Sequence, residues 1–263
     1  MKLGVFITTH FNDSGTGNYR HGEGFAERVQ DSYHCMLNKY NEFDPGVDTD
    51  VCVVDTESNL KEFTDWISTV EYVTHKVIPN VGGVFASVKH IMHGEPEIME
   101  QYDYFFFHTD DSVYVHGDNW AKEAIEEYNA AKNLGIMGRE LSSIDLGPQG
   151  LVEHRNVCPH IAEMWNITKI TTIPHLHADW WFMSKDTLRL LSEVWYSPIE
   201  SIKAMQYQRM LENTDYRSLA LMGDSRQALD NFHIGRETDT VLRVEYAGLQ
   251  CKGYEGDKII WDK

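Results

Sequence analysis

The chain has 263 residues, which is long enough to bury a substantial core in one α/β domain. Its formal net charge of −18 comes from 41 acidic and 23 basic residues and opposes the phosphate neutralisation that nucleic-acid binding requires. Nucleic acids and anionic membrane surfaces are therefore excluded as expected partners.

The first half of the chain alternates between strand-like and helix-like patterns. Apolar runs predict strands at residues 3–9, 50–55, 72–78, 104–107 and 134–137. Apolar residues at helical spacing predict helices at residues 25–40, 60–68, 81–92 and 119–132. This alternation predicts a mainly parallel sheet with helices on both faces, and such sheets bind ligands beyond the carboxyl ends of their strands.

The second half has less regular patterns. Residues 138–159 predict a long loop that could cover a site. Strands are predicted at 169–173, 179–183 and 240–246, and helices after a capping Ser184 and at 198–212 and 216–232. We expect one domain over residues 1–263.

The cysteines and the apolar stretches bear on the compartment. The four cysteines form no C-x-x-C pair, which is typical of reduced thiols in the cytoplasm. The apolar run at residues 3–9 is too short for the core of a signal peptide or for a membrane span, and no later run is long enough to span a bilayer. We expect a cytoplasmic protein without an integral membrane segment.

The stretch from residue 102 to residue 114 is the most informative one. Its aromatic run ends in His108, Asp110 and Asp111, groups that a core rejects unless something pairs with them. Strand alternation places His108 and Asp110 on the same side. Carboxylates at a strand end predict a Mg²⁺ or Mn²⁺ site with open positions for substrate phosphates. In the alternative, Asp110 and Asp111 start a turn or cap the helix near Trp120.

The order of these motifs resembles that of GT-A fold nucleotide-sugar glycosyltransferases, closest in style to the family 2 enzymes. Residues 8–12 are similar to the turn after the first strand of that family, without its proline. Residues 55–58 resemble the acidic end of the second strand, and residues 80–83 with Lys89 resemble the helix before the metal strand. Residues 108–110 resemble the Asp-x-Asp motif, with histidine in the first place.

The resemblance implies a Rossmann-like GT-A domain with a nucleotide-binding half at residues 1–137 and an acceptor-binding half at 138–263. It implies a Mn²⁺ or Mg²⁺ ion held by Asp110, a nucleotide base bound by Asp55, and His108 in the place of a residue that contacts the ribose. The cofactor-binding candidates are Thr8, Thr9, Asp55, Lys89, His108, Asp111 and Arg236, and the metal candidates are Asp110 and His233.

Sugar transfer also needs a base against the acceptor hydroxyl if the reaction inverts configuration. In inverting relatives an acid at the start of a late helix serves, and residues 222–226 resemble that motif with glycine in place of glutamate. Asp224 is therefore the first candidate. Asp179 is its competitor because Trp180 and Trp181 follow it. Those two rings could stack on an acceptor sugar or pack into the core.

The resemblance thus implies a hexosyltransferase that moves a sugar from a UDP or GDP type nucleotide-sugar to a carbohydrate or glycan hydroxyl. A non-catalytic nucleotide- or glycan-binding module on the same fold is the alternative, which the missing first motif acid would fit. Residues 54–60 faintly resemble the nucleophile motif of haloacid-dehalogenase phosphatases, but they follow the second strand. A nucleotidyltransferase would need a basic glycine-rich loop, which residues 15–20 imitate weakly.

Overall fold

A computed structural model describes residues 1–11, 27–79, 86–110, 113–145, 172–177, 179–195, 240–241, 244–245 and 247–261. Two compact units make up the chain. The first comprises Met1–Lys132, Asp179–Leu188 and Tyr254–Lys263, and the second comprises Asn133–Ala178 and Arg189–Gly253. The single domain with its two functional halves, 1–137 and 138–263, stays a prediction.

The first unit is built around five neighbouring strands of a mainly parallel sheet. In spatial order they are β9 (Trp180–Ser184), β4 (Tyr104–Thr109), β1 (Lys2–Thr9), β2 (Asp48–Asp55) and β3 (Thr74–Val77). Strand β1 is parallel to β2 and β4, β2 is parallel to β3, and only β9 is antiparallel to its neighbour β4 among these pairs. A separate antiparallel pair joins β5 (Val113–Val115) to β11 (Ile259–Trp261).

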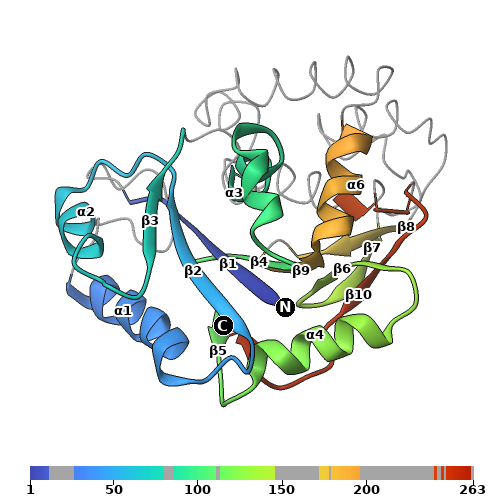
Figure 1. Ribbon diagram of the computed structural model, residues 1–263, viewed down its shortest axis with the longest axis horizontal. Coiled ribbons are helices and arrows are strands. Elements are labelled where there is room, and N and C mark those ends of the chain that lie inside the picture. The colour runs from blue at the N-terminus through green and yellow to red at the C-terminus, as the bar shows by residue number, and fades with distance from the viewer. Residues whose placement is uncertain are drawn as a thin grey trace. The chain divides into compact units, whose positions relative to one another are not determined.

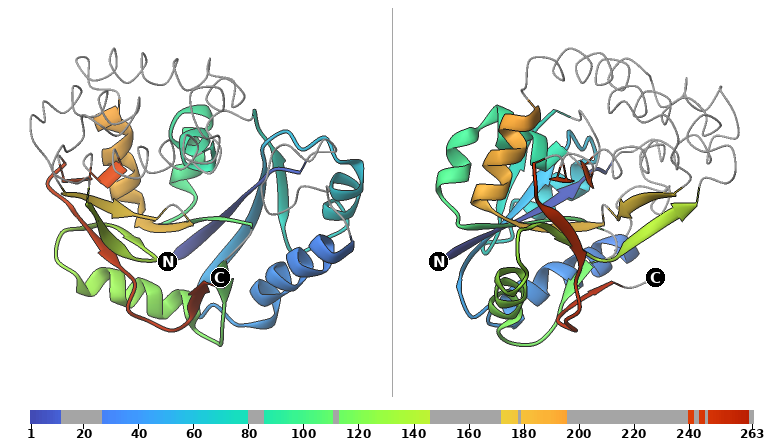
Figure 2. Two further views of the ribbon diagram at one scale, coloured as in Figure 1. Left: turned by 180° about the vertical axis from the view of Figure 1, so that it is seen from behind. Right: turned by 90° about the vertical axis from the view of Figure 1, so that its right-hand side faces the viewer.

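Helices cover both faces of these strands. Their bounds are α1 (Glu27–Glu42), α2 (Lys61–Ile67), α3 (Ala86–Lys89) and α4 (Trp120–Ala130), and α3 continues into a π-helical turn, η2 (His90–Gly94), and a 3-10 turn, η3 (Pro96–Glu100). Figures 1 and 2 show α1 and α4 on one side of the strands and α3 on the other. The predicted fold class, α/β with a mainly parallel sheet and helices on both faces, is confirmed.

Aromatic side chains fill the core on each face of β4. On the side of α1 and α4, the fully buried Phe106 meets Trp180 edge-on, with ring centroids 5.6 Å apart, and also contacts Trp120. On the other side, Phe6 stacks on Phe107 at 5.6 Å. The alternation of side chains along β4 therefore supplies both hydrophobic layers.

The second unit contains two strand pairs. Strand β6 (Leu134–Gly138) is parallel to β10 (Gln250–Gly253), and β7 (Leu141–Asp145) is antiparallel to β8 (Thr172–Leu176).

Helix α6 (Lys185–Trp195) begins after Ser184, whose hydroxyl oxygen accepts the N–H of Thr187 at 3.2 Å, so the predicted cap is confirmed. No helix among the described residues is long and apolar enough to span a membrane.

Three sequence expectations for the second half differ from the structure. Residues 141–145, predicted as part of a loop, form β7, because β8 supplies partners for their backbone groups. Residues 240–241 and 244–245, predicted as strand, are helical, and Val241 and Val244 are both buried at helical spacing. No strand is predicted after residue 246, but the polar residues that follow Gly248 contribute β10 and β11. The helices predicted at 198–212 and 216–232 lie outside the described residues.

Candidate functional site

The carboxyl ends of β1, β2 and β4 are level at one edge of the first unit's sheet. Thr9 is the register partner of Asp55, and Thr8 is the partner of Thr109. Because β9 runs antiparallel to β4, the residue before it reaches the same edge, where the carbonyl of Asp179 accepts the N–H of Thr109 at 3.0 Å. The sheet thereby brings together five predicted site residues: Thr8, Thr9, Asp55, Asp110 and Asp179.

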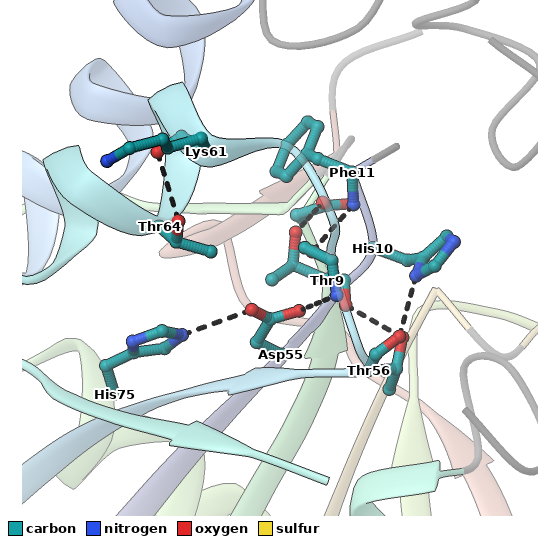
Figure 3. A network of polar contacts seen from close by, with 10 residues as sticks. Thr9, His10, Phe11, Asp55, Thr56, Lys61, Thr64 and His75 are labelled. Atoms are coloured by element: carbon teal, nitrogen blue, oxygen red, sulfur yellow. Dashed lines mark hydrogen bonds and ion pairs between the residues drawn. The ribbon is translucent and has the colours of Figure 1, made fainter. Parts of the chain in front are cut away.

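Asp55 is a fully buried carboxylate at the end of β2. One of its oxygens accepts the N–H of Ser58 at 2.7 Å, and the other lies 3.3 Å from Nε2 of His75 (Figure 3). Burial alone raises the pKa of Asp55, but the hydrogen bonds from His75 and Ser58 outweigh it and lower the pKa below its ordinary value. The turn that Asp55 closes includes Glu57 in the left-handed region, at φ +57°.

Hydrogen bonds tie the segment after β1 to this turn. The N–H of Phe11 donates to the Ser58 hydroxyl at 2.8 Å, and Nδ1 of His10 donates to the Thr56 carbonyl at 2.7 Å (Figure 3). Both the N–H and the hydroxyl of Thr56 donate to the Thr9 carbonyl, each at 2.9 Å. These bonds make one frame from residues 9–11 and 55–59.

The ring of Phe11, which belongs to this frame, packs against aromatic side chains of α1 and α2. The centroid of this buried ring lies 4.6 Å from that of Phe63, and the ring meets Tyr33 of α1 edge-on at a centroid distance of 5.7 Å. Burial, and then the negative charge of Asp110, raise the pKa of Tyr33 well above its ordinary value. Tyr33 therefore stays protonated at neutral pH beside the Asp110 carboxylate.

Asp110 lies half-buried in the turn that follows β4. The hydroxyl of Thr9 donates a hydrogen bond to its Oδ2 atom. Mg²⁺ and related ions commonly take one or two protein carboxylates together with water and substrate phosphates. Asp110 fits as one such carboxylate. Within the described ranges, no group of three or more His, Cys, Asp or Glu side chains could hold an ion by itself.

Thr8 and His108 are less accessible than the prediction of direct ligand contact requires. Thr8 is buried, and its hydroxyl shares a hydrogen bond with that of Ser87 in α3. His108 is only 3% exposed, and both of its ring nitrogens have protein partners, the hydroxyl of Tyr40 and the carbonyl of Thr109. In this state both side chains connect elements of the fold, and their contact with a nucleotide stays a prediction.

Several candidates have no described side chain. Asp111, Asp224, His233 and Arg236 lie outside the described residues, and Lys89 ends α3 with a side chain that is likewise undescribed. Trp180 and Trp181 are both buried, at 1% and 3% exposure. The alternative in which these two rings pack into the core is therefore confirmed, and the rings do not form an exposed surface for sugar stacking.

Sequence reasoning missed four residues that shape the edge: Tyr33, Tyr40, His75 and Ser87. The two tyrosines belong to the apolar stripe of α1, and nothing in the sequence pattern indicates that one faces a carboxylate and the other a histidine. His75 offered a signal, because a histidine near the end of a strand can meet the acid at the end of the neighbouring strand. Its register partner is Val53, two residues before Asp55.

We expect Asp55→Asn to lower the free energy of unfolding by about 1–3 kcal/mol at pH 7, because it weakens hydrogen bonds to a buried charge. The folded-state pKa of Asp55 lies below the ordinary value of 3.8, so its ionised form stabilises the fold above that value. This contribution is lost as the pH falls through the folded-state pKa. Chemical denaturation of both proteins from pH 7 down to about pH 2 measures the difference, because this range extends well below the ordinary value of 3.8.

The matched control is Asp65→Asn, which removes an exposed carboxylate paired with Lys61 on α2. Its effect should stay within about 0.5 kcal/mol, as for other exposed ion pairs. A loss for Asp55→Asn that is equal at every pH would show that packing, not the carboxylate charge, causes the destabilisation.

No protein-family model and no curated protein matches the chain. Mouse xyloside xylosyltransferase 1 is a similar solved structure, with 10% identity and a TM-score of 0.43 over 91% of this chain and 82% of that chain. A mannosyltransferase from Pyrobaculum calidifontis in complex with GDP-Man and Mn²⁺ has 13% identity and a TM-score of 0.38 over 80% and 52%. A cytidylyltransferase from Leptospira borgpetersenii has 10% identity and a TM-score of 0.45 over 98% and 77%.

Two of these three similar structures are glycosyltransferases, and the third is a cytidylyltransferase. Identities of 10–13% and TM-scores below 0.5 leave the residues at the carboxyl edge as the basis for a function.

Proposed function

We propose that the protein is a metal-dependent glycosyltransferase that moves a hexosyl group from a UDP or GDP type nucleotide-sugar to a hydroxyl of a carbohydrate or glycan acceptor, with inversion. One observation carries the proposal: the sheet aligns Thr9, Asp55, Asp110 and Asp179 at its carboxyl edge, and Asp110 is partly exposed there. Ligands of doubly wound α/β sheets bind at this edge. Asp110 and Asp179 are the partly exposed carboxylates among these residues, and Asp110 is the one that the hydroxyl of Thr9 orients.

The role we assign to Asp110 is to hold Mn²⁺ or Mg²⁺. The hydroxyl of Thr9 engages one carboxylate oxygen and fixes the direction of the group. A divalent cation bound there would offset the negative charge that develops on the departing diphosphate. Such an ion would also reduce the repulsion between phosphates and the acidic side chains of the edge.

We assign to Asp55 the support of the nucleotide-binding frame. Its oxygens engage Ser58 and His75, so the carboxylate holds the turn at residues 55–59, to which residues 9–11 are bonded. A rigid frame of this kind places backbone groups for a ligand at little entropic cost. The direct hydrogen bond to the base that the family resemblance implies would require this edge to open, because the Asp55 carboxylate is fully buried.

The general base is one of two acids. Asp179 is the one that the described edge contains, bonded through its carbonyl to the residue before Asp110. Asp224 is the one that the family resemblance implies. Either would take the proton of the acceptor hydroxyl as the bond to the anomeric carbon forms.

A non-catalytic nucleotide-binding module is the second candidate. The observation that favours it is the burial of His108, which stands in the place of the first motif acid and turns into the protein. The site would then keep its cation-binding carboxylate but lack a ribose contact at this position.

Calorimetric titration with UDP, GDP, UDP-glucose and GDP-mannose, with and without Mn²⁺, tests the proposal. We expect Mn²⁺ to lower the Kd of one of these nucleotides by about tenfold or more, since the ion offsets the charge of the phosphates. The protein should also hydrolyse the matching nucleotide-sugar slowly, and the release of UDP or GDP measures this hydrolysis.

The outcomes separate the candidate functions. Metal-dependent binding without donor turnover supports the binding module. Phosphate release from p-nitrophenyl phosphate without nucleotide binding supports the phosphatase. Absence of Mn²⁺-dependent binding for every nucleotide would overturn the transferase.

A further inference from the structure

His108 is a polar residue deep inside the core of the first unit. It occupies the fifth position of β4, where its register partners are Ile7 on β1 and Trp180 on β9. Its side chain faces α1, lies 5.0 Å from the ring of Phe106 between ring centroids, and is 3% exposed. A histidine here needs hydrogen-bond partners, because an unsatisfied buried polar group is costly.

The two ring nitrogens of His108 have different partners. Nδ1 lies 2.7 Å from the carbonyl oxygen of Thr109, and because a carbonyl oxygen only accepts, Nδ1 carries the hydrogen. Nε2 lies 2.6 Å from the hydroxyl of Tyr40 on α1. Burial raises the pKa of Tyr40 well above its ordinary value, so its hydroxyl keeps its hydrogen and can donate a hydrogen bond to Nε2. The contact with the Thr109 carbonyl places a hydrogen on Nδ1.

Ring packing fixes the orientation of this imidazole. The ring of Tyr40 stacks on it with centroids 5.8 Å apart and an interplanar angle of 20°. Trp120 of α4 meets Tyr40 edge-on, with ring centroids 5.6 Å apart. Rotation of the His108 side chain would break its stack with Tyr40 and its two hydrogen bonds.

The carbonyl that His108 holds belongs to the peptide that links Thr109 to Asp110. The N–H on the other side of Thr109 donates to the carbonyl of Asp179 at 3.0 Å. The chain is therefore held by hydrogen bonds on both sides of Thr109, immediately before the turn that carries Asp110. Thr9 then holds the Asp110 side chain itself.

We propose that His108 is a positioning residue, which together with Tyr40 fixes the peptide before Asp110 and so places the Asp110 carboxylate for a divalent cation. This inference rests on the proposed function, because the cation and its nucleotide are what the placement serves. Its consequence is that residue 108 acts on the ligand through the backbone, and that another part of the chain recognises the ribose.

Three variants separate the hydrogen bonds from the packing. His108→Asn keeps an amide N–H close to the position of Nδ1, His108→Phe keeps a ring without either nitrogen, and Tyr40→Phe removes only the donor to Nε2. We expect the Kd for UDP with Mn²⁺ to rise about 10–100-fold in His108→Phe, the range for lost supporting contacts of metal ligands. His108→Asn should restore it to within about threefold, and Tyr40→Phe should weaken binding about threefold to tenfold.

Two measurements accompany the titrations. Circular dichroism and thermal unfolding establish that each variant is folded, and imidazole ¹⁵N NMR of the wild-type protein reports the tautomer of His108. We expect the Nδ1–H form, and loss of its signature in His108→Phe assigns it. If His108→Phe does not fold, Tyr40→Phe carries the binding test, since its ring retains the packing.

Failure of the inference is distinct from failure of the proposed function. Wild-type protein that binds no nucleotide with Mn²⁺ overturns the proposed function. Wild-type protein that binds, with unchanged affinity in His108→Phe, or in Tyr40→Phe where the first variant does not fold, overturns the positioning role. An Nε2–H tautomer also overturns it, because the carbonyl of Thr109 would then lack its donor.

Discussion

Replacement of Asp110 by asparagine is expected to abolish the Mn²⁺-dependent part of nucleotide binding and to lower donor turnover by roughly 10²-fold or more. Asp110 is the one partly exposed carboxylate that follows β4 within the described residues, and Thr9 already orients it. Asparagine keeps the shape and one acceptor oxygen but removes the charge that a divalent ion requires. The fold should persist, because the residue lies in a turn.

Calorimetry with UDP at several Mn²⁺ concentrations measures the effect of Asp110→Asn, and donor hydrolysis measures the loss of turnover. Asp103→Asn is the matched control, since Asp103 is an exposed acid just before β4, where its carboxylate accepts the N–H of Lys2 at 2.8 Å. Asp103→Asn should bind and turn over like the wild-type protein. Binding by Asp110→Asn that still responds to Mn²⁺ as the wild-type protein does would remove Asp110 from the ion site.

The position of the site could be predicted because burial and strand direction determine it. The apolar runs before Asp55 and Asp110 are long enough to show buried strands, and parallel neighbours end at the same edge. The register of β1 with β2 and β4 then brings Thr9 to both acids. The sequence pattern therefore sufficed to predict that these candidate residues meet at one edge of the sheet.

The partners of each side chain could not be predicted in the same way. Tyr40 meets His108 across 68 residues of sequence, and Tyr33 lies beside Asp110 although it belongs to the apolar stripe of α1. Such contacts depend on how far α1 packs along the sheet, and periodicity does not determine that distance. Strand alternation placed His108 correctly on the side of Asp110 but gave no indication that its ring turns into the core.

The errors near the end of the chain have a different cause. Residues 240–246 alternate apolar and polar side chains in part, and two of them are valines, which favour strands. The observed helical residues bury Val241 and Val244, three positions apart, so the helical period prevails there. The polar strand Gln250–Gly253 shows no hydrophobic pattern and is identifiable only through its pairing with β6.

If Asp179 is the general base, Asp179→Asn should lower donor turnover by about 10²–10⁴-fold, while the Kd for UDP with Mn²⁺ stays within about threefold of the wild-type value. Asp179 lies at the edge with its carbonyl bonded to Thr109, and the backbone of the variant can make the same bond. The substitution removes the negative charge of the side chain and its capacity to accept a proton. A change in turnover without a change in binding is the signature of a group that acts in the transition state.

Asp224→Asn is the comparison that decides between the two acids predicted as the base. If Asp179 is the base, Asp224→Asn should retain turnover within about tenfold, since it removes no group that acts in the transition state. Asp186→Asn, an exposed position in the first turn of α6, is the control for loss of an acid near β9 and should leave both quantities unchanged. A large loss of turnover in Asp224→Asn together with an active Asp179→Asn would assign the proton transfer to Asp224, as the motif at residues 222–226 implies.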